Sequence, residues 1–269
     1  MKKKVNTREE DIAEVQEMWN EAARAKKDSP LATTHDRILR DLEIAAILKR
    51  IPEGKKTLKV LDIGCGNGFS TLEYAKARSH EFHGIDFSPE MVKYAEAAKK
   101  KAIKKLKGKV SFAEGDALKV TAKDGTYDIV TTDRCIVNLV TLEDQKASIK
   151  EIHRLLKKGG RAIICEGTMQ GFTNINNLRK LAKLPIMKNH WHNIYLDETK
   201  LEPVMRKYFE VIEIDPFAST YYIASRIFNA LAATDPSKPD YFSKINKVAA
   251  TMPSFGEYSP LKVWYLKKR

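Results

Sequence analysis

The sequence predicts an α/β protein built on a doubly wound, mostly parallel sheet. A short apolar run ends at Asp62 and leads into a glycine-rich loop, residues 64–68, followed by a segment that can be helical. A second apolar run closes on Asp86 and is again followed by a helix start. Further alternation of strand and helix continues to Glu166. Strands that alternate with helices in this way pair in parallel, because each helix carries the chain back across the sheet.

Two helices precede the first strand. Residues 8–26 place Ile12, Val15, Met18 and Trp19 on one side of an amphipathic helix, and a polar break follows. A second helix is expected from about residue 34 to residue 50. Residues 1–52 are therefore expected to form two helices ahead of the sheet, either as a packed pair or as a helical cover over the site.

The glycine loop predicts a ligand that lies on bare backbone. Glycine permits positive φ and lets a ligand approach where a Cβ would collide. An acid at the end of the next strand, here Asp86, can accept hydrogen bonds from ribose hydroxyls. Gly68 follows Gly66 by two positions rather than the three of a nicotinamide fingerprint, which favours another adenosine-type ligand. The binding residues expected in these two segments are Asp62, Gly64, Cys65, Gly66, Asn67, Asp86 and Phe87.

The remaining elements of this half follow in order. Ser88 is a good N-cap and Pro89 suits the first helical position. Strands are expected at residues 110–114, 127–132 and 161–166, with a helix at 142–157 that stops at Gly159-Gly160.

Five segments carry, in this order, the runs VLDIGCGNGFST, GIDFSPEMV, FAEGDAL, YDIVTTD and EIHRLLKKGGRAII. They resemble the successive motifs of class I S-adenosylmethionine-dependent methyltransferases and cover about residues 58–166. The resemblance implies a Rossmann-like, seven-stranded sheet with an antiparallel last strand, and S-adenosyl-L-methionine as cofactor. It also implies that Asp116 and Ala117 read adenine, that Asp133 lies near the cofactor, and that Arg134 and Asn138 face the acceptor.

The second half, residues 167–269, is expected to serve the acceptor. Helices are predicted at 174–184 and, capped by Asp197, to residue 208, and the last two strands at 210–215 and 262–267. The long connection between these strands exceeds what a hairpin needs. We expect residues 217–260 to form a helical lid, with a Pro-rich turn between two helices and with Tyr221, Tyr222 and Arg226 as substrate residues. The whole chain, residues 1–269, then forms one domain with residues 53–166 as its cofactor-binding half.

No catalytic residue is evident from the sequence, since alignment of donor and acceptor supplies much of the rate of an in-line displacement. His192, in the aromatic loop 189–195, is the first candidate for a general base, with His190, His35 and Asp133 behind it. A packing role for His192 is equally compatible with the sequence. The three cysteines lack metal-ligand spacing, and no metal site is expected.

The net charge of +13 raises the question of nucleic acid. Much of it comes from lysines at 99–109, on a helix whose end points away from the expected crevice, and the Asn/Asp-Pro-Pro-aromatic signature of amino-directed nucleic-acid enzymes is absent. No specific nucleic-acid or membrane partner is therefore expected. The N-terminal residues lack the apolar core of a secretory signal, so a cytoplasmic location is expected.

Taken together, the sequence predicts methyl transfer to oxygen or nitrogen of a small, soluble and possibly anionic acceptor. An RNA or protein methyltransferase and a non-catalytic S-adenosylmethionine-binding protein are the alternatives. The acceptor, the atom methylated, the use of a base and the oligomeric state stay open.

Overall fold

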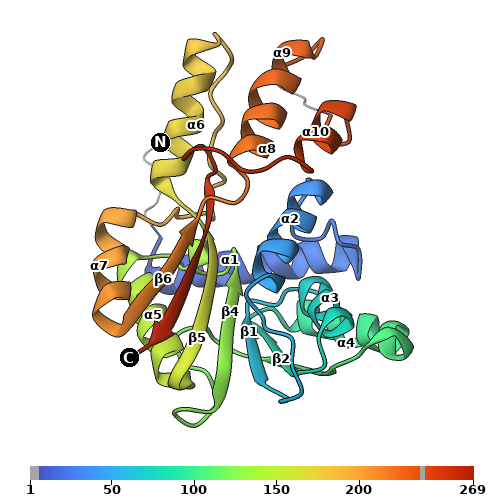
Figure 1. Cartoon of the computed structure of the whole chain (residues 1–269), viewed down its shortest axis with the longest axis vertical. Coiled ribbons are helices and arrows are strands. Elements are labelled where there is room, and N and C mark those ends of the chain that lie inside the picture. Colours follow the sequence, from blue (N-terminus) through green and yellow to red (C-terminus); the bar gives the residue numbers. More distant parts are fainter. Residues whose placement is uncertain (1–5, 237–239) are drawn as a thin grey trace.

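The computed structural model describes residues 6–236 and 240–269, and its centre is a seven-stranded sheet of order β3-β2-β1-β4-β5-β7-β6 (Figure 1). The first five strands pair in parallel, and β7 runs antiparallel to both of its neighbours, β5 and β6. This confirms the predicted fold class. The strands are β1 (Lys59–Ile63), β2 (Glu81–Asp86), β3 (Lys109–Glu114), β4 (Tyr127–Asp133), β5 (Leu156–Gly167), β6 (Phe209–Asp215) and β7 (Leu261–Lys268).

The chain order reverses between β1 and β4. Val60 of β1 pairs with Phe82 of β2 on one side and with Ile129 of β4 on the other. The connections that leave these strands run to opposite sides, which opens a crevice beyond their carboxyl ends. The sheet topology therefore places the glycine loop and Asp133 at one site.

Helices cover both faces of the sheet. One face packs against α5 (Leu142–Leu155) and α7 (Glu198–Tyr208), through buried residues such as Ile152 and Leu201. The other packs against α2 (Arg37–Leu48) and α3 (Phe69–Ala77), through residues such as Ile47 and Tyr74, while α4 (Pro89–Ala102) packs against α3, β2 and β3. The predicted caps are present: Ser88 accepts from the backbone N–H of Met91, and Thr141 and Asp197 cap α5 and α7.

The N-terminal cover consists of α1 (Arg8–Lys26) and α2. Thr7 and Glu10 form a capping box that begins α1. Helix α2 begins at Arg37 rather than at the expected residue 34, because the Asp36 carboxylate accepts from the backbone N–H of Leu39 at 3.0 Å and ends the preceding loop. Figure 1 shows α1 lying across the carboxyl ends of the central strands.

Helices of the second half stand beyond the same ends of the strands (Figure 1). They are α6 (Met169–Leu181), the lid helix formed by α8 (Ser219–Ile223), the π-helical η3 (Ala224–Phe228) and α9 (Asn229–Ala232), and then α10 (Lys244–Ala249). Part of the expected Pro-rich turn, residues 237–239, lies outside the described residues. Over the described ranges, no helix is both long and apolar enough to cross a membrane.

Two further element boundaries differ from the expectation. Helix α6 begins five residues earlier than predicted, because Thr168 accepts from the backbone N–H of Gly171 and caps it. Gly171 disfavours a helix, but a Cβ there would lie 2.0 Å from the carbonyl oxygen of Ser259, so the loop before β7 requires glycine. Strand β5 begins at Leu156 rather than at the expected residue 161, where Leu156 pairs with Tyr127 through an irregular register. Helix α5 therefore ends at Leu155, and Gly159 and Gly160 lie within the strand instead of ending the helix.

Candidate functional site

The glycine loop after β1 holds three residues at positive φ: Gly64 at 74°, Gly66 at 56° and Gly68 at 77°. A Cβ at Gly64 would lie 2.5 Å from the Cβ of Cys135, so this glycine lets the loop pack against the end of β4. A Cβ at Gly66 would approach only Thr33, at 3.3 Å. The backbone at Gly66 is therefore open toward the cavity beside it.

Asp86 organises this loop from the end of β2. Its Oδ2 accepts from the backbone N–H of Gly66 at 2.7 Å, and its Oδ1 accepts from that of Ser88 at 2.9 Å. Burial raises the pKa of Asp86, and the backbone hydrogen bonds oppose this rise. Each carboxylate oxygen keeps a further lone pair, so Asp86 can both fix the loop and accept from a ligand.

Asp62 has a different place. It is buried, and its carboxylate accepts from the hydroxyls of Thr71 in α3 and Thr131 in β4. Burial raises its pKa to about 6. These bonds tie the end of β1 to its two neighbouring elements.

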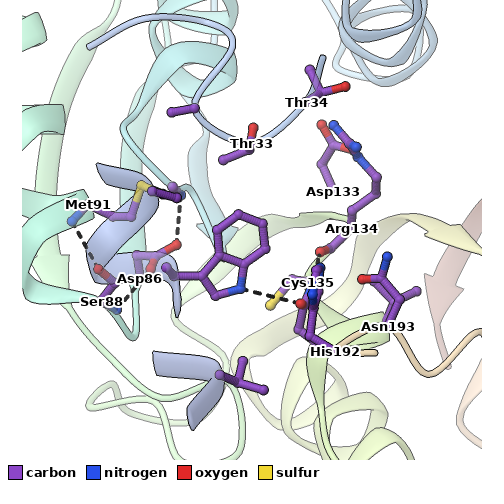
Figure 2. Close-up of a pocket in the computed structure, with 18 of the residues that line it drawn as sticks. Thr33, Thr34, Asp86, Ser88, Met91, Asp133, Arg134, Cys135, His192 and Asn193 are labelled. Carbon is purple, nitrogen blue, oxygen red and sulfur yellow. Dashed lines mark hydrogen bonds between the residues drawn. The ribbon is translucent and has the colours of Figure 1, made fainter. Parts of the chain in front are cut away.

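A cavity of about 720 Å³ lies beyond the glycine loop. Figure 2 shows Asp86, Ser88 and Met91 on one side of it and Asp133, Arg134, His192 and Asn193 on the other. The sequence-predicted residues that line the cavity are His35, Asp62, Gly64, Cys65, Gly66, Asn67, Asp86, Phe87, Asp116, Ala117, Asp133, Arg134, Asn138, His190, His192, Tyr222 and Arg226. Tyr221 is not among its lining residues.

Helix α1 roofs the side of the cavity near Asp86. Gln16 donates to the carbonyl oxygen of Phe87 at 2.8 Å. At the N-terminal end of α1, Arg8 makes a two-pronged contact with Asp144 of α5. Near its C-terminal end, the Asn67 amide donates to two carbonyl oxygens in the turn after α1. Asn67 therefore anchors the cover to the glycine loop through its amide group.

The end of β4 carries a buried group of four charges. Arg40 of α2 contacts Asp133 at 2.5 Å and Glu43 at 3.3 Å. Arg134 has the left-handed φ of 54° and reaches Glu43 at 3.2 Å. Burial raises the pKa of Glu43 to about 7 against the opposing effect of Arg134. Burial opposes the charge on Arg134, but Glu43 and Asp133 outweigh it and raise the pKa of the guanidinium. Both arginines that point toward the crevice are thus neutralised by carboxylates of the chain.

The turn after β4 is held by Glu166, the penultimate residue of β5. Its buried carboxylate accepts from the backbone N–H groups of Cys135, Ile136 and Val137, which begin the short 3-10 helix η2 (Ile136–Asn138). Burial raises the pKa of Glu166 to about 7, and these hydrogen bonds oppose that rise. Glu166 therefore fixes the backbone on which Arg134 and Asn138 stand.

His192 lies on the cavity wall opposite Asp86. Its ring packs edge-on against Trp19 and Trp191 and stacks with His190 at a centroid distance of 5.5 Å. Burial, followed by the effect of His190, lowers the pKa of His192 to about 4. Among the described residues its buried Nδ1 has no hydrogen-bond partner. The imidazole is therefore neutral at physiological pH, with one ring nitrogen unpaired.

Asn138 and Asp116 also have partners within the chain. The Asn138 amide donates to the carbonyl of Arg134, and its oxygen accepts from the indole N–H of Trp19 at 3.3 Å. Asp116 is exposed at the cavity mouth and accepts from the backbone N–H of Leu118. Asn138 thereby links α1 to the end of β4.

The lid meets the cavity through Tyr222, Arg226 and Tyr241. The Arg226 guanidinium lies 4.6 Å from the centroid of the Tyr241 ring and 5.1 Å from that of Tyr222, and it contacts Asp36 at 2.8 Å. Tyr221 is buried behind this wall, and its hydroxyl donates to the same carboxylate at 2.7 Å. Arg226 is therefore occupied by the chain itself, and Tyr221 supports the wall rather than facing the cavity.

Sequence reasoning missed four residues of this site: Asp36, Arg40, Glu43 and Glu166. Their partners are distant in the chain, as with the 93 positions between Arg40 and Asp133. A charged residue inside an apolar helix pattern, such as Glu43 next to Ile44, was the one signal available. Such a residue is buried only when a partner of opposite charge accompanies it.

Residues 54–205 match a family described as a methyltransferase domain. The chain is 40% identical over 110 residues to norajmaline N-methyltransferase from Rauvolfia serpentina, covering 41% of this chain and 36% of that protein. It is 31% identical over 152 residues to demethylmenaquinone methyltransferase from Lactiplantibacillus plantarum, covering 56% of each. The matches thus span little more than half of these curated relatives at most.

Solved structures with similar folds cover nearly the whole chain. A putative methyltransferase from Haloferax volcanii, in complex with a methyltransferase activator, gives a TM-score of 0.62 at 17% identity over 93% of this chain and 96% of that one. The cyclase SpnF gives 0.60 at 18% identity over 97% and 96%. At such identities the likeness shows the fold. The family match covers more than half of the chain, and the chain therefore belongs to the methyltransferase domain family, the class I S-adenosylmethionine-dependent methyltransferases.

Proposed function

We propose that this chain transfers a methyl group to an oxygen or nitrogen atom of a small, largely apolar acceptor. The observation that carries the proposal is the continuity of one cavity. It begins at the bare backbone of Gly66 and at Asp86, and it extends beneath α1 to Tyr222 and the rest of the lid. A volume of about 720 Å³ falls within the usual range of small-molecule sites, about 300–1,000 Å³.

The residues at the glycine loop fit S-adenosylmethionine. Gly66 presents backbone without a Cβ, and Asp86 offers free lone pairs within the same cavity. We assign the ribose to Asp86, the methionine part to Gly64 and Gly66, and the adenine to the edge formed by Phe87, Asp116 and Ala117. In this assignment Asp62, Cys65 and Asn67 hold the loop in place, and Asp133 lies toward the acceptor. The bound cofactor supplies a methyl group activated on a sulfonium sulfur.

The acceptor region favours an uncharged, ring-bearing molecule over the anion suggested by Arg226 in the sequence. Arg226 is paired with Asp36, and Arg134 with Glu43, so the positive charge of each guanidinium already has a carboxylate of the chain beside it. Many of the other lining side chains are aromatic or aliphatic, and they come from α1, α2, η2, the 189–195 loop and the lid. They include Ile12, Val15, Met18, Trp19, Leu39, Val137, Tyr195 and Tyr222.

The chain's own contribution to the reaction is alignment, exclusion of water and the holding of one proton. Alignment can supply about 7–11 kcal/mol of an in-line displacement. The unpaired Nδ1 of His192 lines the same cavity and can accept a proton from an acceptor hydroxyl or amine, as a base worth about 10²–10⁴-fold. Because His192 is neutral, it can take this role without first losing a proton.

The test uses S-adenosylmethionine labelled in its methyl group. The protein is incubated with fractionated cell extract, and the products are separated into small organic molecules, protein and RNA. We expect label in an organic-extractable product, and much less of it at limiting cofactor when Asp86→Ala replaces the wild type. Label in RNA or protein, or no transfer to any fraction by a chain that binds the cofactor, contradicts the proposal. The last result favours a binding protein that retains the fold.

A further inference from the structure

The exposed apolar side chains of the chain are concentrated on its second half. Of the fifteen large hydrophobic side chains exposed among the described residues, thirteen follow residue 168, and the other two are Phe87 and Ile103. Scattered single residues of this kind are normal on a protein surface. Their collection on the segments that form the lid and its neighbours is not explained by the cavity, because these side chains face outward.

The densest group lines a groove on the outer side of the lid, between α8 and η3 on one side and α10 on the other. The groove has a volume of about 550 Å³, and Thr220 and Lys244 are the polar members of its lining. Phe228 is 57% exposed, and Val248 and Phe255 are each 62% exposed. Ile223, Ile245 and Met252 complete its apolar lining. This groove is separate from the methyl-transfer cavity, which the same lid lines with Tyr222 and Tyr241 on its inner side.

The segments that carry these side chains are basic. Residues 241–256 contain Lys244 and Lys247 and no acidic residue. Residues 169–190, which form α6 and the chain after it, contain one arginine, three lysines and no acidic residue. Asp235 and Asp240 lie in the connection between α9 and α10. The lysines of these segments, Lys180, Lys183, Lys188, Lys244 and Lys247, are all exposed.

We propose that the outer face of the lid binds the surface of an anionic lipid bilayer, with the groove side chains entering the interface. Aromatic and aliphatic side chains next to exposed lysines are the signature of an interfacial segment, because the rings and alkyl stems enter the headgroup region while the ammonium groups meet lipid phosphates. The net charge of +13 adds long-range attraction of the same sign. Binding to the surface of a bilayer requires neither a membrane-spanning helix nor a partner protein of complementary shape.

This placement would bring an apolar acceptor dissolved in lipid to the lid, next to the cavity that the inner side of the same helix lines. The bilayer proposal does not depend on methyl transfer, because binding can be measured without either substrate. Failure of one proposal therefore leaves the other standing.

The experiment is flotation of the full chain with two kinds of vesicle. One kind is phosphatidylcholine alone, and the other contains an equal amount of phosphatidylglycerol. We expect the wild type to float with the anionic vesicles and to do so about tenfold less with the neutral ones. Phe228→Ser combined with Val248→Ser should lower the partition coefficient about tenfold through lost apolar burial. Lys244→Glu combined with Lys247→Glu should do the same on the anionic vesicles.

The matched control is Ile103→Ser combined with Ile212→Ser, which removes two exposed apolar side chains away from the lid and should leave flotation unchanged. Circular dichroism checks that each variant is folded. Lys244 and Lys247 are exposed, so their substitution supplies a second test if the serine variant does not fold. The proposal is overturned if the wild-type protein does not float with the anionic vesicles. So does a concentration-dependent dimer, measured by sedimentation, that the Phe228 and Val248 substitutions abolish, since the groove then belongs to a second copy.

Discussion

The guanidinium of Arg226 lies 2.8 Å from the carboxylate of Asp36, across 190 positions of sequence. Both side chains are buried, and the same carboxylate also accepts from the hydroxyl of Tyr221 and from the backbone N–H of Leu39. One acidic residue therefore caps a helix of the N-terminal cover and holds the lid against it. The two segments that enclose the cavity are joined at this point.

We predict that Arg226→Ala lowers the free energy of unfolding by about 3–5 kcal/mol, because the change leaves the buried Asp36 carboxyl group without its cationic partner. Urea unfolding followed by circular dichroism measures this. Arg206→Ala is the matched control, since Arg206 forms an exposed pair with Glu202 one helical turn away and should cost less than about 1 kcal/mol. Equal losses in the two variants would show that the buried pair contributes no more to stability than the exposed one.

Asp86→Ala is expected to weaken S-adenosylmethionine binding at least about tenfold, because charge-assisted hydrogen bonds contribute about 1.5–3 kcal/mol each. Calorimetric titration of the folded variant measures the affinity. Asp128→Ala removes a carboxylate of β4 that accepts from the backbone N–H of Lys59, at the amino-terminal ends of the strands and away from the cavity. This change should leave the affinity unchanged. A folded Asp86 variant with wild-type affinity would remove this residue from the proposed site.

Asp62 predicts a pH dependence of stability. Its pKa is raised from an ordinary value of 3.8 to about 6, chiefly by burial. A group with a raised folded pKa contributes stability that is fully present below its unfolded pKa and is lost as the pH rises through the folded pKa. Relative to the wild type, Asp62→Asn should therefore gain stability between pH 4 and pH 7, by up to about 3 kcal/mol for a shift of two units.

The measurement for Asp62 is denaturant unfolding at several pH values in this range. Asp128→Asn is the control of opposite sign. Burial raises the pKa of Asp128, but the bonds from Lys157 and Lys59 outweigh it and lower the pKa, so its contribution is present at neutral pH and is lost as the pH falls. A wild-type and Asp62→Asn difference that does not vary with pH would argue that Asp62 is ionised throughout.

If His192 is the general base, its pKa determines the pH below which kcat/KM falls. With a pKa of about 4 it stays neutral through most of the acidic range, so kcat/KM should remain level down to about pH 5 and fall below it. His190→Ala removes a neighbour that lowers this pKa and should move the limb to higher pH. His192→Ala should lose about 10²–10⁴-fold in rate. Full activity of His192→Ala, or a limb near 6.5 that His190→Ala leaves in place, would assign His192 a packing role.

The sequence predicts the sheet well because each strand is a local apolar run bounded by glycine or an acid. It also brings the glycine loop, Asp86 and Asp133 to one edge, since the carboxyl ends of parallel strands meet there. It could not predict that Arg226 would form an ion pair with Asp36, because ion pairs between segments that are distant in the sequence leave no local pattern. The same limit applies to the apolar groove. The sequence shows no spanning segment, whereas the outward placement of Phe228 and Val248 arises only when the lid helices pack.

The π-helical turn at Ala224–Phe228 gives the lid an unusual sensitivity to length. One residue added to a helix rotates everything after it by about 100°, and here Arg226 faces inward while Phe228 faces outward. Deleting a single residue from this turn would rotate the downstream part of the helix by about 100° relative to the part before it, so that different side chains would face the cavity and the outer groove. Relatives with one residue more or fewer in this turn would therefore differ both in the lid side chains that line the cavity and in those exposed on its outer face. A single-residue insertion could thus change both properties in one evolutionary step.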